Sequence, residues 1–201
     1  MTAPQAGVTL SIMEAKIRCA CGAIEGHLNE PQVATRARCY CKDCQAFARF
    51  LGEPRFVLDD RGGTDIIATV PRHLHFTRGL DQLQCMSLGP KGLLRWYCRG
   101  CRTPIANTPR DPRMSYVGVV RACLAGSAEE IDAAFGPASL AINTESATGP
   151  VASSKLAMLG SMFRILRNLI GARLSGAWKS NPFFQEGTYD PVVAPVGPDA
   201  K

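Results

Sequence analysis

The sequence has no run of about 20 apolar residues, the length that a helix needs to cross a bilayer. The stretch 1–16 also lacks a basic segment that leads into an apolar one, so we expect no secretory signal there. No internal repeat is present. These absences predict a cytoplasmic protein whose domain is not built from internal repeats.

The composition lacks a strong bias. The chain has 201 residues, of which 46% are hydrophobic and 20% are charged, as is typical of a globular domain with a real core. A bound metal would therefore supplement the core rather than replace it. The formal net charge of +6 is mild, and a solvated surface is its simplest explanation. Because the sequence has neither a base-reading motif nor an aromatic stacking platform, we expect no nucleic-acid partner.

The segment 16–137 consists of short strand-like stretches separated by Gly, Pro and Asp, which favours an open β-sandwich or barrel. The expected strands are Ile17–Ala20, Ala23–Leu28, Thr64–Val70, His73–Thr77, Gln82–Leu88, Leu93–Tyr97 and Tyr116–Val120. Two helices accompany them, one from Cys41 to Leu51 and one over Ala128–Phe135. Ser127 and Glu130 are spaced as a capping box at the start of the second helix.

The remaining part of the chain has a different composition. Residues 138–154 are rich in Ala, Ser, Thr, Gly and Pro and predict a linker. Residues 155–184 predict a basic amphipathic helix, centred on Lys155–Leu174. Its apolar residues recur at helical spacing: Leu159, Met162, Phe163, Leu166, Leu169, Ile170 and Leu174. We expect flexible segments at 1–15 and 185–201.

Nine cysteines are present, and in a reducing compartment such cysteines are more often metal ligands than disulfides. Cys98 and Cys101 form a Cys-x-x-Cys knuckle, which points two sulfurs at one ion. Zinc takes four ligands, so a second pair must come from elsewhere in the chain. Cys19 and Cys21 are available, and Gly22 allows a sharp turn after them. These four cysteines predict a closed, structural zinc site.

Cys39, Cys41 and Cys44 lie within six residues and can face one ion across a loop and the first turn of a helix. Three protein ligands with an open fourth position are the arrangement of a catalytic zinc, and the open position would hold water or a soft thiolate. Cys85 and Cys123 occur singly and fit buried, inert cysteines. Cys85 is nevertheless also a candidate fourth ligand, which would close the site. A redox role for the knuckle is less favoured, because no thioredoxin-like βαβ pattern surrounds it.

Basic residues surround the cysteine groups in the sequence. They would offset the charge of −2 of a four-thiolate zinc site and favour ionised sulfur, unless they are simply solvated. These residues are Arg18, Arg36, Arg38, Lys42, Arg49, Arg95, Arg99 and Arg102.

The order Cys-x-Cys-Gly, Cys-x-Cys-x-x-Cys and Cys-x-x-Cys over residues 16–125 resembles the glutathione-dependent formaldehyde-activating enzyme family, which includes centromere protein V. The resemblance implies a mainly β fold with peripheral helices, namely a zinc-stabilised β-tent or open β-sandwich. It implies a structural zinc at Cys19, Cys21, Cys98 and Cys101, and a second, labile and possibly catalytic zinc at Cys39, Cys41 and Cys44. The chain departs from the family pattern at Tyr40, where the family has His, in residues 45–50, and in the helix after the linker.

The resemblance also implies a function. This would be a zinc-dependent carbon–sulfur lyase or synthase that acts on a small thiol adduct, with two zinc ions per chain and a glutathione-type thiol as co-substrate. Arg38, Lys42 and Arg49 are the basic residues nearest to the middle cysteine group and are candidates for binding the carboxylates of such a substrate. No general acid or base is identifiable. His73 and His75 share one face of an expected strand and fit ordinary strand residues.

A non-enzymatic binding module is the second hypothesis. Both zinc ions would then be structural, and the basic helix would carry the function. Between Lys155 and Lys179 there are five basic residues and no acidic one. This pattern fits contact with a membrane surface or a partner, whereas packing on the domain or self-association is the simpler alternative.

Overall fold

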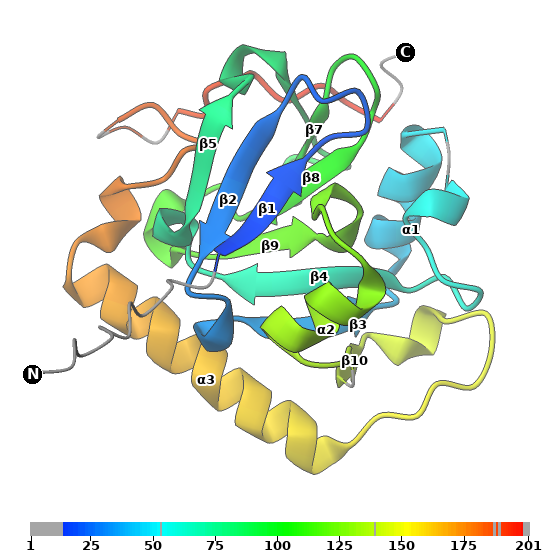
Figure 1. Ribbon diagram of the computed structural model, residues 1–201. Helices are drawn as coiled ribbons and strands as arrows, with labels where there is room; N and C mark the ends of the chain where they lie inside the picture. Colours follow the sequence, from blue (N-terminus) through cyan, green and yellow to red (C-terminus); the bar gives the residue numbers. More distant parts are fainter. Residues whose placement is uncertain (1–13, 53, 139, 187, 189, 199–201) are drawn as a thin grey trace, which may run out of the picture.

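A computed structural model describes residues 14–198, other than 53, 139, 187 and 189. Two β-sheets face each other, and helices lie at the periphery (Figure 1). The mainly β fold with peripheral helices is therefore confirmed. Most of the predicted flexible N-terminal segment lies outside the described residues. Within the described part of the chain, no helix combines the length and apolarity that a membrane crossing requires.

The smaller sheet has the order β1-β2-β5 and is antiparallel throughout. Its strands are β1 (Glu14–Arg18), β2 (Glu25–Asn29) and β5 (Leu74–Arg78). The larger sheet has the order β10-β3-β4-β9-β8-β7-β6, and β10 is parallel to β3 whereas the other neighbours are antiparallel. Its strands are β3 (Thr35–Cys39), β4 (Thr64–Thr69), β6 (Leu83–Met86), β7 (Leu94–Cys98), β8 (Pro104–Thr108), β9 (Val117–Val120) and β10 (Leu140–Ile142).

The main core fills the space between the two sheets. Trp96 at its centre is fully buried, and its indole Nε1–H donates to the Thr108 hydroxyl at 2.9 Å. Phe183, from the segment after the third helix, packs on the Trp96 ring with the ring centroids 4.9 Å apart. The C-terminal part of the chain therefore contributes to the core, which sequence composition did not indicate.

Three α-helices lie around the sheets: α1 (Lys42–Phe50), α2 (Ala128–Phe135) and α3 (Lys155–Leu174). The predicted capping box of α2 is confirmed. The Ser127 N–H donates to the Glu130 carboxylate at 2.8 Å, and the Glu130 N–H donates to the Ser127 hydroxyl at 3.2 Å. Such short-range signals are readable because all their atoms lie within one helical turn.

Strands β3, β8 and β10 were not among the expected elements. β10 lies inside residues 138–154, for which the composition predicts a linker. The described part of the expected flexible tail is also paired: the Ser87 N–H donates to the Val196 carbonyl, and the Val196 N–H donates to the Cys85 carbonyl, each at 2.9 Å. Both segments are ordered by long-range backbone pairing, which composition does not report.

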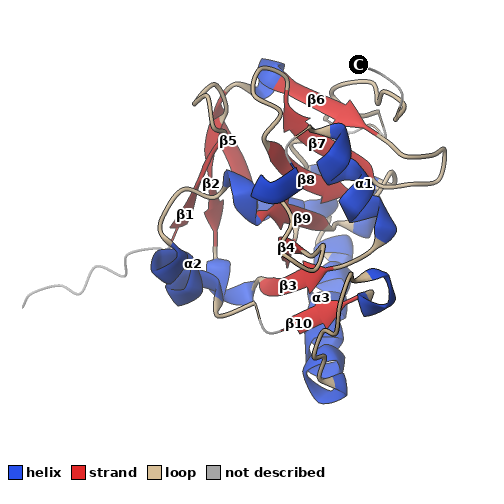
Figure 2. Ribbon diagram, turned by 90° about the vertical axis from the view of Figure 1, so that its right-hand side faces the viewer, coloured by secondary structure: helices blue, strands red, loops and turns tan. Residues whose placement is uncertain are grey.

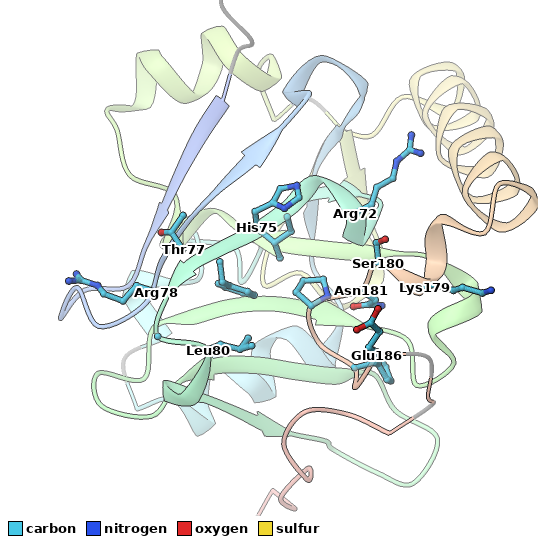
Figure 3. A pocket seen from close by; sticks show the side chains of 14 residues that line it. Arg72, His75, Thr77, Arg78, Leu80, Lys179, Ser180, Asn181 and Glu186 are labelled. Carbon is cyan, nitrogen blue, oxygen red and sulfur yellow. The ribbon is translucent and has the colours of Figure 1, made fainter.

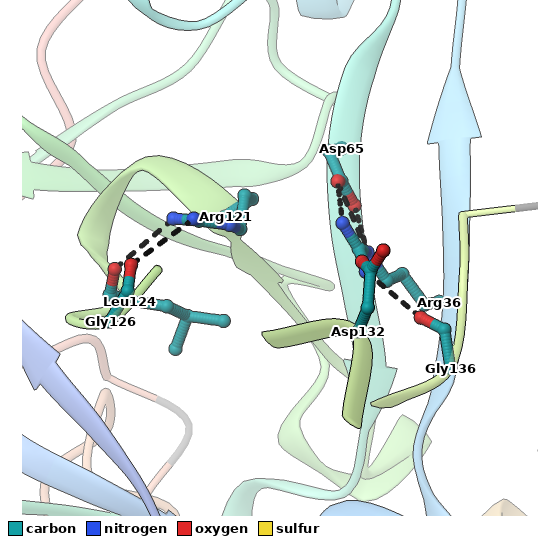
Figure 4. A network of polar contacts seen from close by, with 7 residues as sticks. All are labelled: Arg36, Asp65, Arg121, Leu124, Gly126, Asp132 and Gly136. Carbon is teal, nitrogen blue, oxygen red and sulfur yellow. Dashed lines mark hydrogen bonds and ion pairs between the residues drawn. The ribbon is translucent and has the colours of Figure 1, made fainter. Parts of the chain in front are cut away.

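Arg36 ties two strands to a helix (Figure 4). Its side chain is 7% exposed, and its Nε and Nη2 donate to the Asp65 carboxylate at 3.0 and 2.7 Å. Its Nη1 donates to the carboxylate of Asp132 and, at 2.9 Å, to the Gly136 carbonyl. Arg36 is a charged residue at a buried position of β3. The sequence of this strand therefore resembles a polar loop as long as the partners of Arg36 are unknown.

We expect Asp65→Asn to destabilise the fold by about 2 kcal/mol, because it removes one partner of a buried, bidentate ion pair. Asp132→Asn is the matched control. Its carboxylate is 53% exposed, so we expect a loss below about 1 kcal/mol. Urea denaturation of both variants measures the difference, and equal losses would contradict the role given to the Arg36–Asp65 pair.

Candidate metal centres

The first cysteine group lies where turns of the two sheets meet. Cys19 and Cys21 lie on the turn from β1 to β2, and Cys98 and Cys101 lie on the turn from β7 to β8. All four sulfurs lie within 4.8 Å of one another, with 3.5 Å between Cys19 and Cys21 and 3.8 Å between Cys21 and Cys98. A tetrahedral zinc with Zn–S bonds of about 2.3 Å spaces its sulfurs about 3.8 Å apart. The group therefore fits a four-thiolate zinc.

The local backbone is shaped around these sulfurs. Gly22 has φ of 73°, and its N–H donates to the Cys19 carbonyl at 2.9 Å, which closes the turn. The Ile24 N–H donates to the Cys19 sulfur at 3.2 Å, and the Thr103 hydroxyl lies 3.1 Å from the Cys101 sulfur. Hydrogen bonds of this kind orient metal ligands and stabilise thiolate.

The two cysteines between β7 and β8 differ in electrostatics. Burial raises the pKa of Cys98 to about 12. Burial also acts to raise the pKa of Cys101, but hydrogen bonds from the Thr103 hydroxyl and N–H outweigh it and lower that pKa to about 6. A bound metal would hold both as thiolates, since only the deprotonated sulfur is a ligand.

The second group lies where β3 meets α1. Cys39 ends β3, Cys41 is the N-cap of α1, and Cys44 lies in its first turn. Their sulfurs lie within 4.8 Å of one another; Cys39 and Cys44 are buried, whereas Cys41 is half-buried. The Cys41 sulfur accepts from the Cys44 N–H at 3.3 Å. Hydrogen bonds with the Cys41 and Cys44 side chains lower the pKa of Cys39, whereas the contacts with Cys39 and Cys41, together with burial, raise the pKa of Cys44.

The second group has three members. Among residues 14–198 that the structure describes, no further Cys, His, Asp or Glu joins it. Cys85 lies on β6 in the core between the sheets, and burial raises its pKa to about 12. Cys123 is also fully buried, with its sulfur 3.1 Å from the Val120 carbonyl. Both fit inert core cysteines, and Cys85 does not close the second site.

Arg95 supplies a buried positive charge beside the second group. Its side chain is 2% exposed, and its Nη1 lies 3.9 Å from the Cys44 sulfur and donates to Asn107 Oδ1 at 3.1 Å. The partly exposed Asp43 lies 3.7 Å from its Nη2. A buried cation needs compensating negative charge. Asp43 supplies part of it, and the sulfurs of this group would supply more as metal-bound thiolates.

The position of Arg95 could not be read from its sequence neighbours. It lies three residues before Cys98, but an odd separation along a strand places two side chains on opposite faces of the sheet. Cys98 and Trp96 therefore face the core between the sheets, whereas Arg95 and Tyr97 face α1. Arg95 thus serves the second group rather than the first.

Asn143 completes the surroundings of the second group. It follows β10 in a left-handed conformation with φ of 53°, and its Nδ2 donates to the Cys39 sulfur at 3.3 Å. No sequence signal marks this residue, because it reaches Cys39 only through the parallel pairing of β10 with β3.

The residues expected to bind substrate take different positions. Arg38 is exposed on β3, next to Cys39, and Lys42 is the exposed first residue of α1. Arg49 lies in the last turn of α1, about 8 Å along the helix axis from Cys44. Arg38 and Lys42 are therefore neighbours of Cys39 and Cys41 in the chain, whereas Arg49 lies further along α1. Because Arg38 and Cys39 are adjacent on a strand, their side chains are on opposite faces of the sheet, and the Arg38 side chain lies near Tyr40 and Asp59.

Tyr40 stands where the resembled family has His. It is buried, and its hydroxyl donates to the Asp59 carboxylate at 3.0 Å. Burial and this carboxylate raise the pKa of Tyr40, so it stays protonated. A Cβ at Gly63 would lie 2.6 Å from its ring, so the turn before β4 packs directly on it. Tyr40 has a structural role in holding this turn.

A hollow of about 590 Å³ lies at β5 (Figure 3). Its lining includes His75, Arg72, Arg78 and Lys179, but none of the nine cysteines. The basic side chains diverge around its rim, and Arg78 is held by Glu25 at 2.9 Å. This hollow is therefore not part of either candidate metal centre. His73 is buried beside the Thr69 hydroxyl at 3.2 Å, as an ordinary structural histidine.

A protein-family model matches residues 12–194, and its description is "Family of unknown function (DUF6151)". The match spans both cysteine groups and α3. A search among curated proteins found no match. One similar solved structure is a crystal structure of a Rhodobacter sphaeroides protein, which is 24% identical. That alignment covers 56% of this chain and 89% of that one with a TM-score of 0.39, a likeness too weak for any argument.

We expect the purified protein to hold two zinc ions per chain. Cys98→Ser should remove one ion and lower the free energy of unfolding by about 3 kcal/mol or more, because structural zinc binding is coupled to folding. Cys41→Ser should remove the other ion and leave a folded protein. Metal analysis combined with thermal unfolding measures both effects.

Cys123→Ala is the control for that experiment, since it removes a buried cysteine from outside both groups. It should retain both ions. Loss of both ions from the Cys41→Ser variant would contradict two independent centres.

We expect Arg95→Met to weaken zinc binding at the second centre by about tenfold or more, because outer residues beside metal ligands tune their affinity. The substitution removes the charge and keeps much of the side-chain volume. In competition with a zinc-binding dye, one ion should be bound more weakly than in the wild type and the other should be bound equally tightly. Equal retention of both ions would show that Arg95 does not stabilise the thiolates.

Proposed function

Because the chain belongs to the DUF6151 family, whose function is unknown, we propose its function from its chemistry. It is a zinc protein whose second centre, Cys39, Cys41 and Cys44, makes or breaks a carbon–sulfur bond in a small thiol adduct. The first centre, at Cys19 and its three partners, is structural.

One observation carries this proposal: three thiols converge on one point and the described residues offer no fourth ligand. The half-buried Cys41 is the most exposed of the three, so the open position is on the solvent side. Structural zinc sites have four protein ligands, whereas catalytic ones keep a position free. The unequal ligand sets therefore favour different roles for the two centres.

The chemistry at the free position follows from soft ligands and charge. A zinc ion held there would keep a bound thiol deprotonated at neutral pH. With its three cysteine ligands the ion would have a formal charge of −1, which the adjacent Arg95 guanidinium offsets in part, because Arg95 also faces Asp43. Arg95 near Cys44 and Asn143 on Cys39 hold two of the ligands in place. The positive charge of Arg95 favours one more anionic sulfur at this partly exposed cluster.

The proposed reaction is the reversible addition of a thiol to a small aldehyde. The sulfur forms a bond to the carbonyl carbon, the C=O π pair moves to oxygen, and that oxygen receives the proton released by the thiol. In the reverse direction the carbon–sulfur bond breaks and the aldehyde leaves. No oxidant or reductant is needed. The exposed Arg38 and Lys42, which neighbour Cys39 and Cys41 in the chain, are the candidates for binding the carboxylates of a glutathione-type thiol, with Arg49 as a more distant candidate.

The resemblance of the cysteine pattern to the glutathione-dependent formaldehyde-activating enzymes supports this chemistry and the β-tent architecture as parts of the same proposal. The Tyr40 departure is compatible with it, because the Tyr40 hydroxyl is engaged with Asp59. The activity then depends on the three sulfurs rather than on the residue between the first two.

The direct test is exchange spectroscopy with ¹³C-formaldehyde and glutathione, using the zinc-loaded full chain. We expect the wild type to accelerate exchange between the free and thiol-bound carbon, and Cys41→Ser to reduce this by about tenfold or more through loss of the ion. Arg38→Gln and Lys42→Gln should each raise the glutathione concentration at half-maximal rate by about three- to tenfold.

Cys123→Ala and Lys91→Gln serve as controls and should leave the exchange unchanged. The proposal would be refuted if both zinc ions were bound equally tightly, glutathione did not change their binding, and the wild type did not accelerate the exchange. That result would favour the alternative, a non-enzymatic module in which both ions are structural.

A further inference from the structure

Helix α3 contacts the domain through a narrow, weakly apolar side. The Asn168 Nδ2 donates to the Val33 carbonyl at 3.1 Å, and Ala172 is buried against the body of the protein. Ile165 and Leu169 are half-buried on the same side. The helix therefore lies along the edge of the larger sheet, next to β10, β3 and β4 (Figures 1 and 2).

The opposite side of α3 carries the larger apolar residues. We call them the outer stripe: Leu156, Leu159, Met162, Phe163, Leu166, Ile170 and Leu174. They are 49% to 83% exposed, and no described part of the chain covers them. At 100° per residue they fall within about 120° of the helix circumference, which makes one continuous face. Of the apolar positions predicted from helical spacing, only Leu169 turns inward.

The outer stripe is bordered by positive charge. Arg167 lies next to one edge with Arg164 further round on the same side, and Arg173 lies just inside the other edge; all three are exposed. From Glu145 to Glu186 the intervening sequence contains no acidic residue. Long arginine side chains can lie along an apolar face and extend their charged ends outward, toward an anionic surface.

We propose that the outer stripe binds an anionic lipid membrane, with α3 lying flat in the interface. An exposed apolar face with basic borders is the pattern of helices that lie in the membrane surface. Acyl chains would cover the stripe, and anionic headgroups would pair with the arginines. This inference goes beyond the chemistry proposed for the second metal centre and does not depend on it.

Charge argues against a second copy as the occupant. Two outer stripes placed face to face would bring Arg164, Arg167 and Arg173 of each chain toward those of the other. No carboxylate lies between Glu145 and Glu186 to pair with them. An anionic bilayer supplies both an apolar layer that covers the stripe and negative charge that pairs with its arginines.

The test is flotation of the zinc-loaded full chain with vesicles of phosphatidylcholine alone or with about one quarter phosphatidylglycerol. We expect binding to the anionic vesicles only, and weakening when the salt is raised from about 0.1 to 0.5 M. The double variant Phe163→Ser/Leu166→Ser should bind about tenfold or more weakly, since it removes central apolar anchors. Arg164→Gln/Arg167→Gln should lose the preference for anionic lipid.

Phe56→Ser/Leu80→Ser removes two exposed apolar residues from elsewhere and should bind like the wild type. Lys16→Gln/Lys91→Gln is the matching charge control. Metal analysis checks that every variant retains its two ions and hence its fold. Wild type that stays free of anionic vesicles, or binds no better than the Phe163/Leu166 variant, overturns the proposal. A dimer that this variant abolishes also overturns it, because the stripe would then be covered by a second copy.

Discussion

The contact among four sulfurs at the meeting of two turns controls how the two sheets are joined. The sulfurs of Cys19 and Cys21 belong to the smaller sheet's turn, and those of Cys98 and Cys101 to the larger sheet's turn. As free thiolates they would repel one another, and as a metal-bound set they close a loop of nearly 80 residues. A bound metal would thus fix the core between the sheets at one end by coordination, in addition to apolar packing.

The second centre uses the same ligand type for a different purpose. Its three cysteines lie within one short segment, so it adds little to the joining of distant elements. Its surroundings are instead assembled from far apart in the chain: Arg95 comes from β7 and Asn143 from the end of β10. A centre with local ligands and long-range supporting groups can exchange a ligand without loosening the fold. This separation is compatible with the proposed roles, in which one centre is structural and the other reactive.

The orientation of α3 reverses the usual expectation for an amphipathic helix. A helix normally turns its apolar stripe toward the core. Here the inward contacts are made by small and polar residues such as Ala172 and Asn168, while Phe163 and Leu166 face outward. The main core is already closed by the smaller sheet and by Phe183. The apolar surface of α3 is consequently available for an external surface.

The sequence alone determined features whose atoms are close in the chain. The Cys-x-x-Cys knuckle, the Cys39–Cys44 group, the capping box of α2 and the bounds of α3 all depend on spacing within a few turns or residues. Only the tertiary structure decided the rest. It made β3 an inner strand between β10 and β4, with Arg36 paired to Asp65, and it placed Arg95 on the face of β7 opposite to Cys98. It also left Cys85 outside the second centre and turned the stripe of α3 outward. These outcomes depend on which strands pair and which faces are already covered, and contacts between distant residues leave no periodic or spacing signal in a single sequence.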